Sequence, residues 1–144
     1  MKYLTKYRLF ESIEPYKFQY IGKERASYIY KFSDGINEFR VEIDRLPDGE
    51  AELRYLVKDG ESWSFKEVKT NIFKVCETVF GVILRDFINK NEWCSMIVIN
   101  GLGKESEKES YTQRTKVYWR YLNNNPIEGW SIDKYNNEIY IDRN

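Results

Sequence analysis

Residues 71–100 read NIFKVCETVFGVILRDFINKNEWCSMIVIN, and this stretch decides the fold. Apolar residues recur in its first part at steps of three and four: Ile72, Val75, Cys76, Val79, Phe80, Ile83, Phe87 and Ile88. This spacing predicts an amphipathic helix over residues 71–89, with Thr70 or Asn71 as its N-cap. Gly81 lies inside this helix and costs about 1 kcal/mol relative to alanine, unless a neighbouring side chain packs closely against it.

A strand is predicted after this helix, and further strands are predicted before it. Ser95 to Asn100 (SMIVIN) form a short, continuously apolar run, which is typical of a strand covered on both faces. Upstream, aromatic and β-branched residues predict strands over residues 16–21, 26–32, 37–44 and 50–58, with turn residues between them. Apolar and charged residues alternate in the third of these strands, so one face is buried and the other is wet. We therefore predict an antiparallel meander.

The C-terminal part is predicted to add a second helix and a hairpin. Residues 104–110 form a charged stretch that we expect to be a solvated loop, and residues 111–122 form the helix. Residues 130–133 and 138–141 flank a turn and form the hairpin. The expected fold class is α+β, with a mostly antiparallel sheet in the order ββββ-α-β-α-ββ and two helices packed on it. The predicted core is centred on Ile72, Val79, Phe80, Ile83, Phe87, Ile97 and Ile99.

The composition indicates one soluble globular domain. Of the 144 residues, 42% are hydrophobic and 32% are charged, and no apolar run approaches the roughly 20 residues that a membrane helix needs. The 23 basic and 23 acidic residues give a net charge of zero, which argues against a general nucleic-acid binder. We expect residues 12–144 to form this single domain, without membrane contact.

The chain contains no histidine, so a Ser-His-Asp triad and a Cys-His pair are both excluded. Cys76 and Cys94 are too few for a structural zinc site, and we expect free thiols in a reducing compartment. Asp48, Glu50 and Glu52 lie in one turn and its strand, with no lysine two residues after Glu52, so we expect a solvated hairpin and not a nuclease metal site. We predict no metal and no cofactor.

The second predicted helix contains Thr115-Lys116-Val117-Tyr118, which is similar to the LY motif of a known family. From its strands through this helix, the chain resembles the C-terminal two-thirds of GNAT-type N-acetyltransferases. The resemblance implies a truncated GNAT-like fold, an acyl-CoA substrate, and Tyr118 as the general acid on the departing thiolate. In the family, a loop of the form Q/R-x-x-G-x-G/A brings backbone N–H groups to the pyrophosphate, whereas the corresponding residues 68–73 contain no glycine.

The N-terminal segment, Met1 to Glu11, is short, basic and aromatic, and its apolar residues share one helical stripe. It resembles the capsid-targeting peptide of large tailed phages, which begins Met-Lys and ends in Leu/Ile-x-Glu, where the prohead protease cuts. The resemblance implies a small internal head protein that is cleaved between Glu11 and Ser12, with Leu9 as the other recognised residue. The alternative is that this segment is the first strand or helix of the fold.

Three function classes follow. We prefer a phage-encoded, non-enzymatic protein that is packaged in the virion head and binds a protein partner, either a phage scaffold or head protein or a host factor, for example a defence protein that it inhibits. It would then occur in the host cytoplasm and in the virion interior. The alternative is a GNAT-like acyl-CoA N-acyltransferase, active or degenerate, that uses Tyr118. The third class is an inhibitor that acts in the cytoplasm without packaging.

Overall fold

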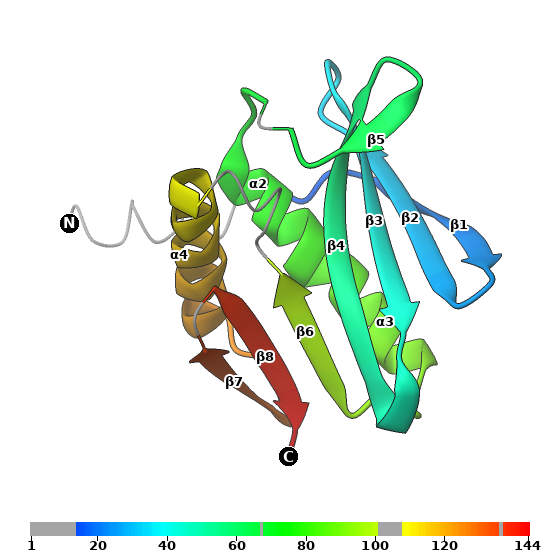
Figure 1. Ribbon diagram of the computed structural model, residues 1–144, viewed down its shortest axis with the longest axis vertical. Coiled ribbons are helices and arrows are strands. Elements are labelled where there is room, and N and C mark those ends of the chain that lie inside the picture. The colour runs from blue at the N-terminus through cyan, green and yellow to red at the C-terminus, as the bar shows by residue number, and fades with distance from the viewer. Residues whose placement is uncertain (1–13, 67, 101–107, 136) are drawn as a thin grey trace.

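A computed structural model of the protein describes residues 14–66, 68–100, 108–135 and 137–144. The described chain is an α+β domain in which one mostly antiparallel sheet packs against two helices (Figure 1). This is the predicted fold class.

The first half of the described chain forms β1 (Phe18–Glu24), β2 (Ser27–Ser33), β3 (Glu38–Arg45), β4 (Glu50–Asp59) and β5 (Ser62–Ser64). β1 to β4 are the predicted antiparallel meander. A short 3-10 helix, η1 (Pro47–Gly49), connects β3 to β4 and begins with a proline, whose fixed φ suits a first helical position. β5 was not predicted, because three residues are too few to show a period of two.

One continuous helix follows, and it consists of α2 (Ile72–Cys76), the π-helical η2 (Glu77–Ile83) and α3 (Leu84–Lys90). Asn71 is the N-cap, as predicted, because its side-chain oxygen accepts a hydrogen bond from the N–H of Lys74 at 3.3 Å. In η2 the N–H of Leu84 donates to the carbonyl of Val79, five residues back. The apolar spacing predicts the helix but not this wider turn.

The second half continues with β6 (Met96–Asn100), α4 (Lys108–Asn124), β7 (Trp130–Tyr135) and β8 (Glu138–Arg143). α4 begins before the predicted start, since Lys108 to Ser110 belong to the helix. The prediction of a loop is therefore wrong for these residues. Lysine and glutamate are good helix formers, so a charged composition alone does not indicate a loop.

The sheet has the strand order β1-β2-β3-β4-β6-β8-β7, and β5 pairs with β4 beside this path. Neighbouring strands are antiparallel except for β4 and β6, which pair in parallel over Glu50 to Leu53 and Met96 to Ile99. The far end of β4 pairs with β5 instead. β4 and β6 therefore diverge beyond Leu53, as Figure 1 shows.

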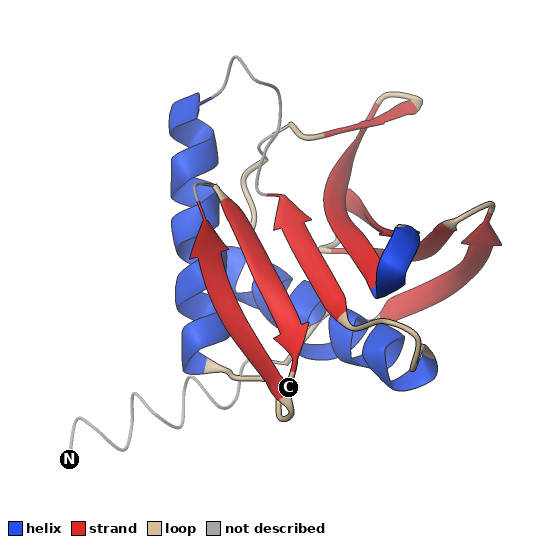
Figure 2. Cartoon of the chain, turned by 60° about the horizontal axis from the view of Figure 1, so that its bottom comes forward, coloured by secondary structure: helices blue, strands red, loops and turns tan. Residues whose placement is uncertain are grey.

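The long helix and α4 lie on the same face of the sheet, so the molecule has two layers (Figure 2). The largest fully buried side chains are Tyr30, Phe39, Phe87, Ile29, Ile43, Leu53, Ile83, Leu84, Ile97, Ile99, Leu122 and Ile139. The predicted core is confirmed at Val79, Phe80, Ile83, Phe87, Ile97 and Ile99, which are all buried. Ile72 is a correction: it is only half-buried, because it faces α4 at the edge of the helical layer.

The prediction that β6 is covered on both faces is also wrong. Ile97 and Ile99 are buried under the helices, whereas Met96 and Val98 point to the opposite face of the sheet and are only half-buried. Both helices lie on one face, and no further layer of described residues covers the opposite face of β6 (Figure 2). A continuous apolar run therefore does not require two covered faces.

Asp34, at the tip of the β2–β3 hairpin, connects this hairpin to the start of the long helix. Its carboxylate accepts hydrogen bonds from the N–H of Ile36 at 2.8 Å, from the N–H of Asn37 at 2.5 Å, and from the Thr70 hydroxyl at 2.8 Å. Burial alone would raise the pKa of Asp34, but these hydrogen bonds outweigh it and lower the pKa to about 2.

We expect Asp34→Asn to lower the free energy of unfolding at pH 7 by about 1 to 2 kcal/mol, an effect reduced by partial exposure. Because the folded-state pKa is depressed, this stabilisation is present above the ordinary value of 3.8 and is lost as the pH falls toward about 2. Urea unfolding from pH 7 to pH 2 measures it. The difference between wild type and Asp34→Asn should shrink with acid, and at pH 7 it should exceed the effect of substituting the exposed Asp133 by asparagine.

Candidate functional site

A groove of about 330 Å³ opens between α2 and α4 on the helical layer. It is lined by Ile72, Phe73, Cys76, Lys116, Val117, Arg120, Tyr121, Asn124 and Asn125. We call it the α2–α4 groove. Figure 1 shows the two helices that form its walls.

The floor of the α2–α4 groove is apolar and chemically inert. Ile72 and Val117 contribute aliphatic side chains from the two helices, and Cys76 lies between them. Burial, and to a lesser degree the charge of Glu77, raise the pKa of the Cys76 thiol to about 12. A thiol with this pKa is protonated at neutral pH, so Cys76 is a packing residue and not a nucleophile.

Tyr121 forms the inner wall of the groove and joins α4 to the long helix. Its hydroxyl donates a hydrogen bond to Glu77 Oε2 at 2.5 Å. Burial, followed by this hydrogen bond, raises the pKa of Tyr121 well above its ordinary value. The pair lies directly over Gly81, where an added Cβ would come within 2.9 Å of the Tyr121 hydroxyl and 3.0 Å of Glu77 Oε1.

This contact explains the glycine that the sequence places inside a helix, because a neighbour does pack closely against it. We expect Gly81→Ala to lower the free energy of unfolding by about 1 kcal/mol. Alanine gains about 1 kcal/mol of helix propensity, but displacing Tyr121 loses a charge-assisted hydrogen bond worth about 1.5 to 3 kcal/mol.

A double-mutant cycle with Tyr121→Phe measures this contact. The phenylalanine removes the hydroxyl that the new methyl group would meet, so Gly81→Ala should be stabilising or neutral in that background. Urea unfolding measures the change in the free energy of unfolding that Gly81→Ala causes in wild type and in Tyr121→Phe. Equal changes would show that the Tyr121 hydroxyl does not require a glycine at position 81.

The outer rim of the groove is basic and aromatic. Lys116 and Arg120 lie one turn apart on α4, and both are exposed. Neither forms an ion pair with any other described residue. Phe73 lies opposite on α2, and it is 52% exposed beside the apolar floor.

The candidate catalytic residue Tyr118 lies on the other side of α4 and does not line the groove. It is only 5% exposed, and its ring packs edge-on against Phe80 at 5.1 Å between centroids. Thr115, from the same motif, is also buried, and its hydroxyl donates to the carbonyl of Asn137 at 3.3 Å. The LY-like motif therefore contributes to the packing of α4 against the long helix and the β7–β8 hairpin.

The segment before α2, where the GNAT resemblance places the pyrophosphate loop, is engaged by other groups. The carbonyl of Lys69 accepts a hydrogen bond from Asn37 Nδ2 at 3.4 Å, and Thr70 is bound to Asp34. The N–H of Lys74 in the first turn of α2 is capped by the Asn71 side chain. This segment therefore holds α2 against the β2–β3 hairpin.

The candidate processing residues Leu9, Glu11 and Ser12 lie outside the described residues. The second predicted free thiol, Cys94, is buried, and its pKa is raised to about 11 by burial. Like Cys76, it is protonated at neutral pH.

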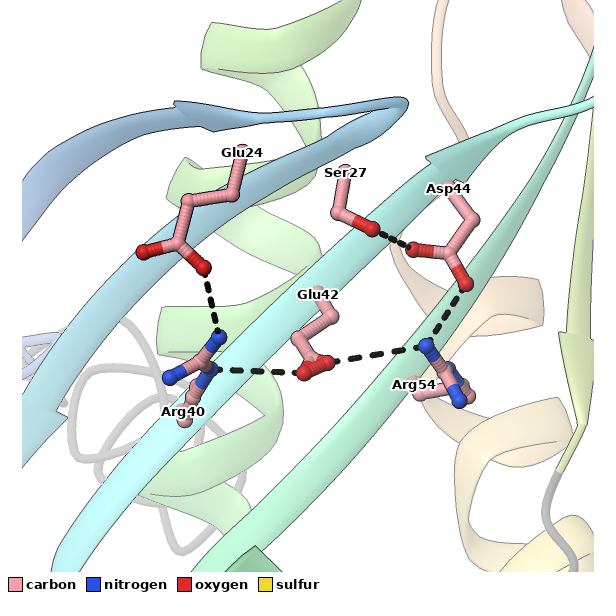
Figure 3. A network of polar contacts seen from close by, with 6 residues as sticks. All are labelled: Glu24, Ser27, Arg40, Glu42, Asp44 and Arg54. Carbon is pink, nitrogen blue, oxygen red and sulfur yellow. Dashed lines mark hydrogen bonds and ion pairs between the residues drawn. The ribbon is translucent and has the colours of Figure 1, made fainter.

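The face of the sheet opposite the helices carries a charged network made of Glu24, Ser27, Arg40, Glu42, Asp44 and Arg54 (Figure 3). Glu42 is central: its two carboxylate oxygens lie 3.3 Å from Arg40 Nε and 3.5 Å from Arg54 Nη2. Arg54 also donates to Asp44 Oδ2 at 2.6 Å. Its neighbours shield the Glu42 side chain, which is only 15% exposed. The network links β1, β2, β3 and β4 and acts structurally.

The α2–α4 groove and the charged network were both missed at the sequence level. The groove had a signal in Phe73, an aromatic residue outside the apolar stripe of the long helix, and in the basic residues that follow each other at one-turn spacing on the second helix. The network had a signal in the alternating charges on the wet face of the third strand.

Among the described residues there is no group of three or more cysteine, aspartate or glutamate residues that could hold a metal ion. Within the same residues, no helix is long and apolar enough to span a membrane. The sequence matches no protein-family model and no curated protein, and the fold matches no solved structure.

Proposed function

We propose that the chain is a non-enzymatic interaction protein of a large tailed phage, packaged in the virion head, which binds a host factor through the α2–α4 groove. The observation that carries the interaction is the exposed Phe73 ring, which lies across an apolar floor from Lys116 and Arg120. An exposed aromatic residue beside a concave apolar surface is typical of an anchor for a partner.

The positions of the reactive side chains support a role without catalysis. Cys76 and Cys94 carry raised pKa values, and Tyr118 is buried against Phe80. Of these groups only Cys76 lines the groove, and its thiol is protonated at neutral pH. Binding is therefore the function that the groove supports best.

The packaging part of the proposal rests on the resemblance of Met1 to Glu11 to capsid-targeting peptides. Intact mass spectrometry of the protein from purified virions tests it. The expected mass corresponds to a chain that begins at Ser12. Virions that lack the protein, or that contain it with residues 1–11 still attached, would overturn this part of the proposal.

The interaction part is tested by capture from infected-cell lysate with wild-type protein and two variants. We expect a host protein to be captured by wild type and by Ile36→Asp, but not by Phe73→Asp. Ile36 is the matched control, because it is a large apolar residue that is 91% exposed at a hairpin tip, away from the groove lining. Capture that does not depend on Phe73 would contradict the assignment of the groove.

The alternative function is a GNAT-like acyltransferase, and the order of elements favours it. A meander, a long helix, a strand, a second helix and a final hairpin follow one another in the chain, in the order on which the resemblance rests. Titration with acetyl-CoA distinguishes the two functions. We expect no saturable binding at micromolar concentrations, and such binding would favour the acyltransferase.

A further inference from the structure

We infer that the α2–α4 groove binds an acidic peptide segment of its protein partner, anchored by apolar side chains of that segment. This inference rests on the proposed interaction function and adds the chemistry of the partner. It combines the shape of the groove, the charge of its rim and the positions of the charged side chains around it.

The shape of the groove indicates a peptide with a few apolar anchors. Its volume of about 330 Å³ lies at the lower end of the roughly 300 to 1,000 Å³ found for small-molecule sites. Two helices bound it, and its floor is formed by aliphatic side chains of Ile72 and Val117. An amphipathic segment binds such a surface by placing its apolar face between the helices.

The charge of the rim selects an acidic segment. Lys116 and Arg120 line the groove, and no aspartate or glutamate is among the described residues that line it. Glu77 is not among the lining residues, and its carboxylate accepts the hydrogen bond of the lining residue Tyr121. Both side chains are exposed at the rim, so their charges face the solvent and attract carboxylates of the bound segment.

Other occupants match this charge less well. The N-terminal segment of the chain itself carries Lys2, Lys6 and Arg8 against Glu11, so it has the same sign as the rim. A second copy would bring an equally basic groove toward the first. A nucleic acid is negative and so matches the sign of the rim, but the molecule has zero net charge, and only two of the described lining residues are cations, few for a phosphate backbone.

Peptide selection tests the inference without knowledge of the natural partner. The full-length protein is immobilised, and a library of random 12-residue peptides is panned against it. We expect the enriched peptides to be net negative and to carry leucine or aromatic residues three or four positions apart. Fluorescence anisotropy then measures the affinity of the best peptide for the protein and its variants.

Two groove variants and two controls give the readout. Phe73→Ala and the double variant Lys116→Glu/Arg120→Glu should each weaken binding about tenfold or more. Ile36→Ala and the double variant Lys17→Glu/Lys134→Glu should bind like wild type, since these exposed residues do not line the groove. The two double variants change the net charge equally, so a difference between them reports on the groove. Thermal unfolding checks that all variants are folded.

The outcomes separate this inference from the proposed function. Selected peptides that are neutral or basic but lose binding with Phe73→Ala would overturn the acidic partner and keep the interaction function. No selected peptide, or binding that is indifferent to all groove variants, would overturn both. The inference would also be overturned if the protein self-associates and Phe73→Ala makes it monomeric. It would likewise be overturned if a single-stranded oligonucleotide binds through Lys116 and Arg120 more tightly than the peptide.

Discussion

Ile83→Ala should lower the free energy of unfolding by about 2 to 5 kcal/mol, the range for removing a large aliphatic side chain from a packed core. Ile83 is the last residue of η2, and its side chain is completely buried between the long helix and the sheet. The loss combines the burial of the removed methyl groups with the cavity that they leave. Urea unfolding followed by circular dichroism measures the change.

The matched control makes the same chemical change at the surface. Ile36→Ala removes the same atoms at a position that is 91% exposed, so its effect should stay within about 0.5 kcal/mol. Similar effects of the two substitutions would contradict the packing of the long helix on the sheet, and with it the fold. The α2–α4 groove should survive Ile83→Ala, because Ile83 does not line it.

The parts of the fold that were predictable are those in which one segment carries its own signal. The long helix repeats apolar residues often enough to define a period, and Asn71 has a side chain that can cap its first turn. The third strand of the meander likewise alternates apolar and charged residues. The π-helical turn was not predictable from the apolar spacing. Over the seven residues of η2, the repeat of a π-helix differs too little from that of an α-helix to change which residues face the core.

Gly81 shows how a local rule points to a tertiary contact. Glycine has a low helix propensity, whereas its neighbours in this segment favour a helix. Such a conflict indicates that a contact from outside the helix requires the glycine. The structure places the Tyr121 hydroxyl and the Glu77 carboxylate there. The sequence indicates that a close neighbour exists, but not which residue of another helix it is.

The groove could not be predicted because apolar spacing does not distinguish a core position from a seam between helices. Ile72 belongs to the same stripe as Val79 and Ile83, yet it lies at the groove, where α2 meets α4 and not the sheet. The exposure of Ile72 depends on where α4 packs. The sequence between β6 and α4 does not indicate that position. The parallel pairing of β4 with β6 was missed for the same reason, since it depends on the path through the long helix.

The charged network depends on strand register, which brings residues distant in sequence to directly opposite positions. Glu42 lies opposite Arg54 on β4, and Asp44 lies opposite Ser27 on β2. Each strand alone predicts only a wet face with scattered charges. Strand pairing brings these charged side chains together, and they cover Glu42 at the centre of the network. Glu42 is therefore mostly buried on the face that was expected to be solvated.

Glu42→Gln should therefore lower the free energy of unfolding by about 2 kcal/mol, although it lies on the open face of the sheet. Breaking a fully buried ion pair costs about 3 to 5 kcal/mol, and the 15% exposure of Glu42 places this loss somewhat below that range. Glutamine keeps the shape of the side chain but removes the charge between Arg40 and Arg54. Arg54 keeps Asp44 as its partner, while Arg40 keeps an ion pair at 3.6 Å with the exposed Glu24 and a cation-π contact with Trp63.

Glu38→Gln is the matched control, since Glu38 lies on the same strand and face and pairs with Lys58 at 3.0 Å. Both members of this pair are about half exposed, so removing the charge should cost well under 1 kcal/mol. Unfolding at about 0.1 M and about 1 M salt adds a second test, because a shielded pair is screened much less than an exposed one. The effect of Glu42→Gln should persist at high salt, and a loss as small and as salt-sensitive as that of Glu38→Gln would mean that water screens the network.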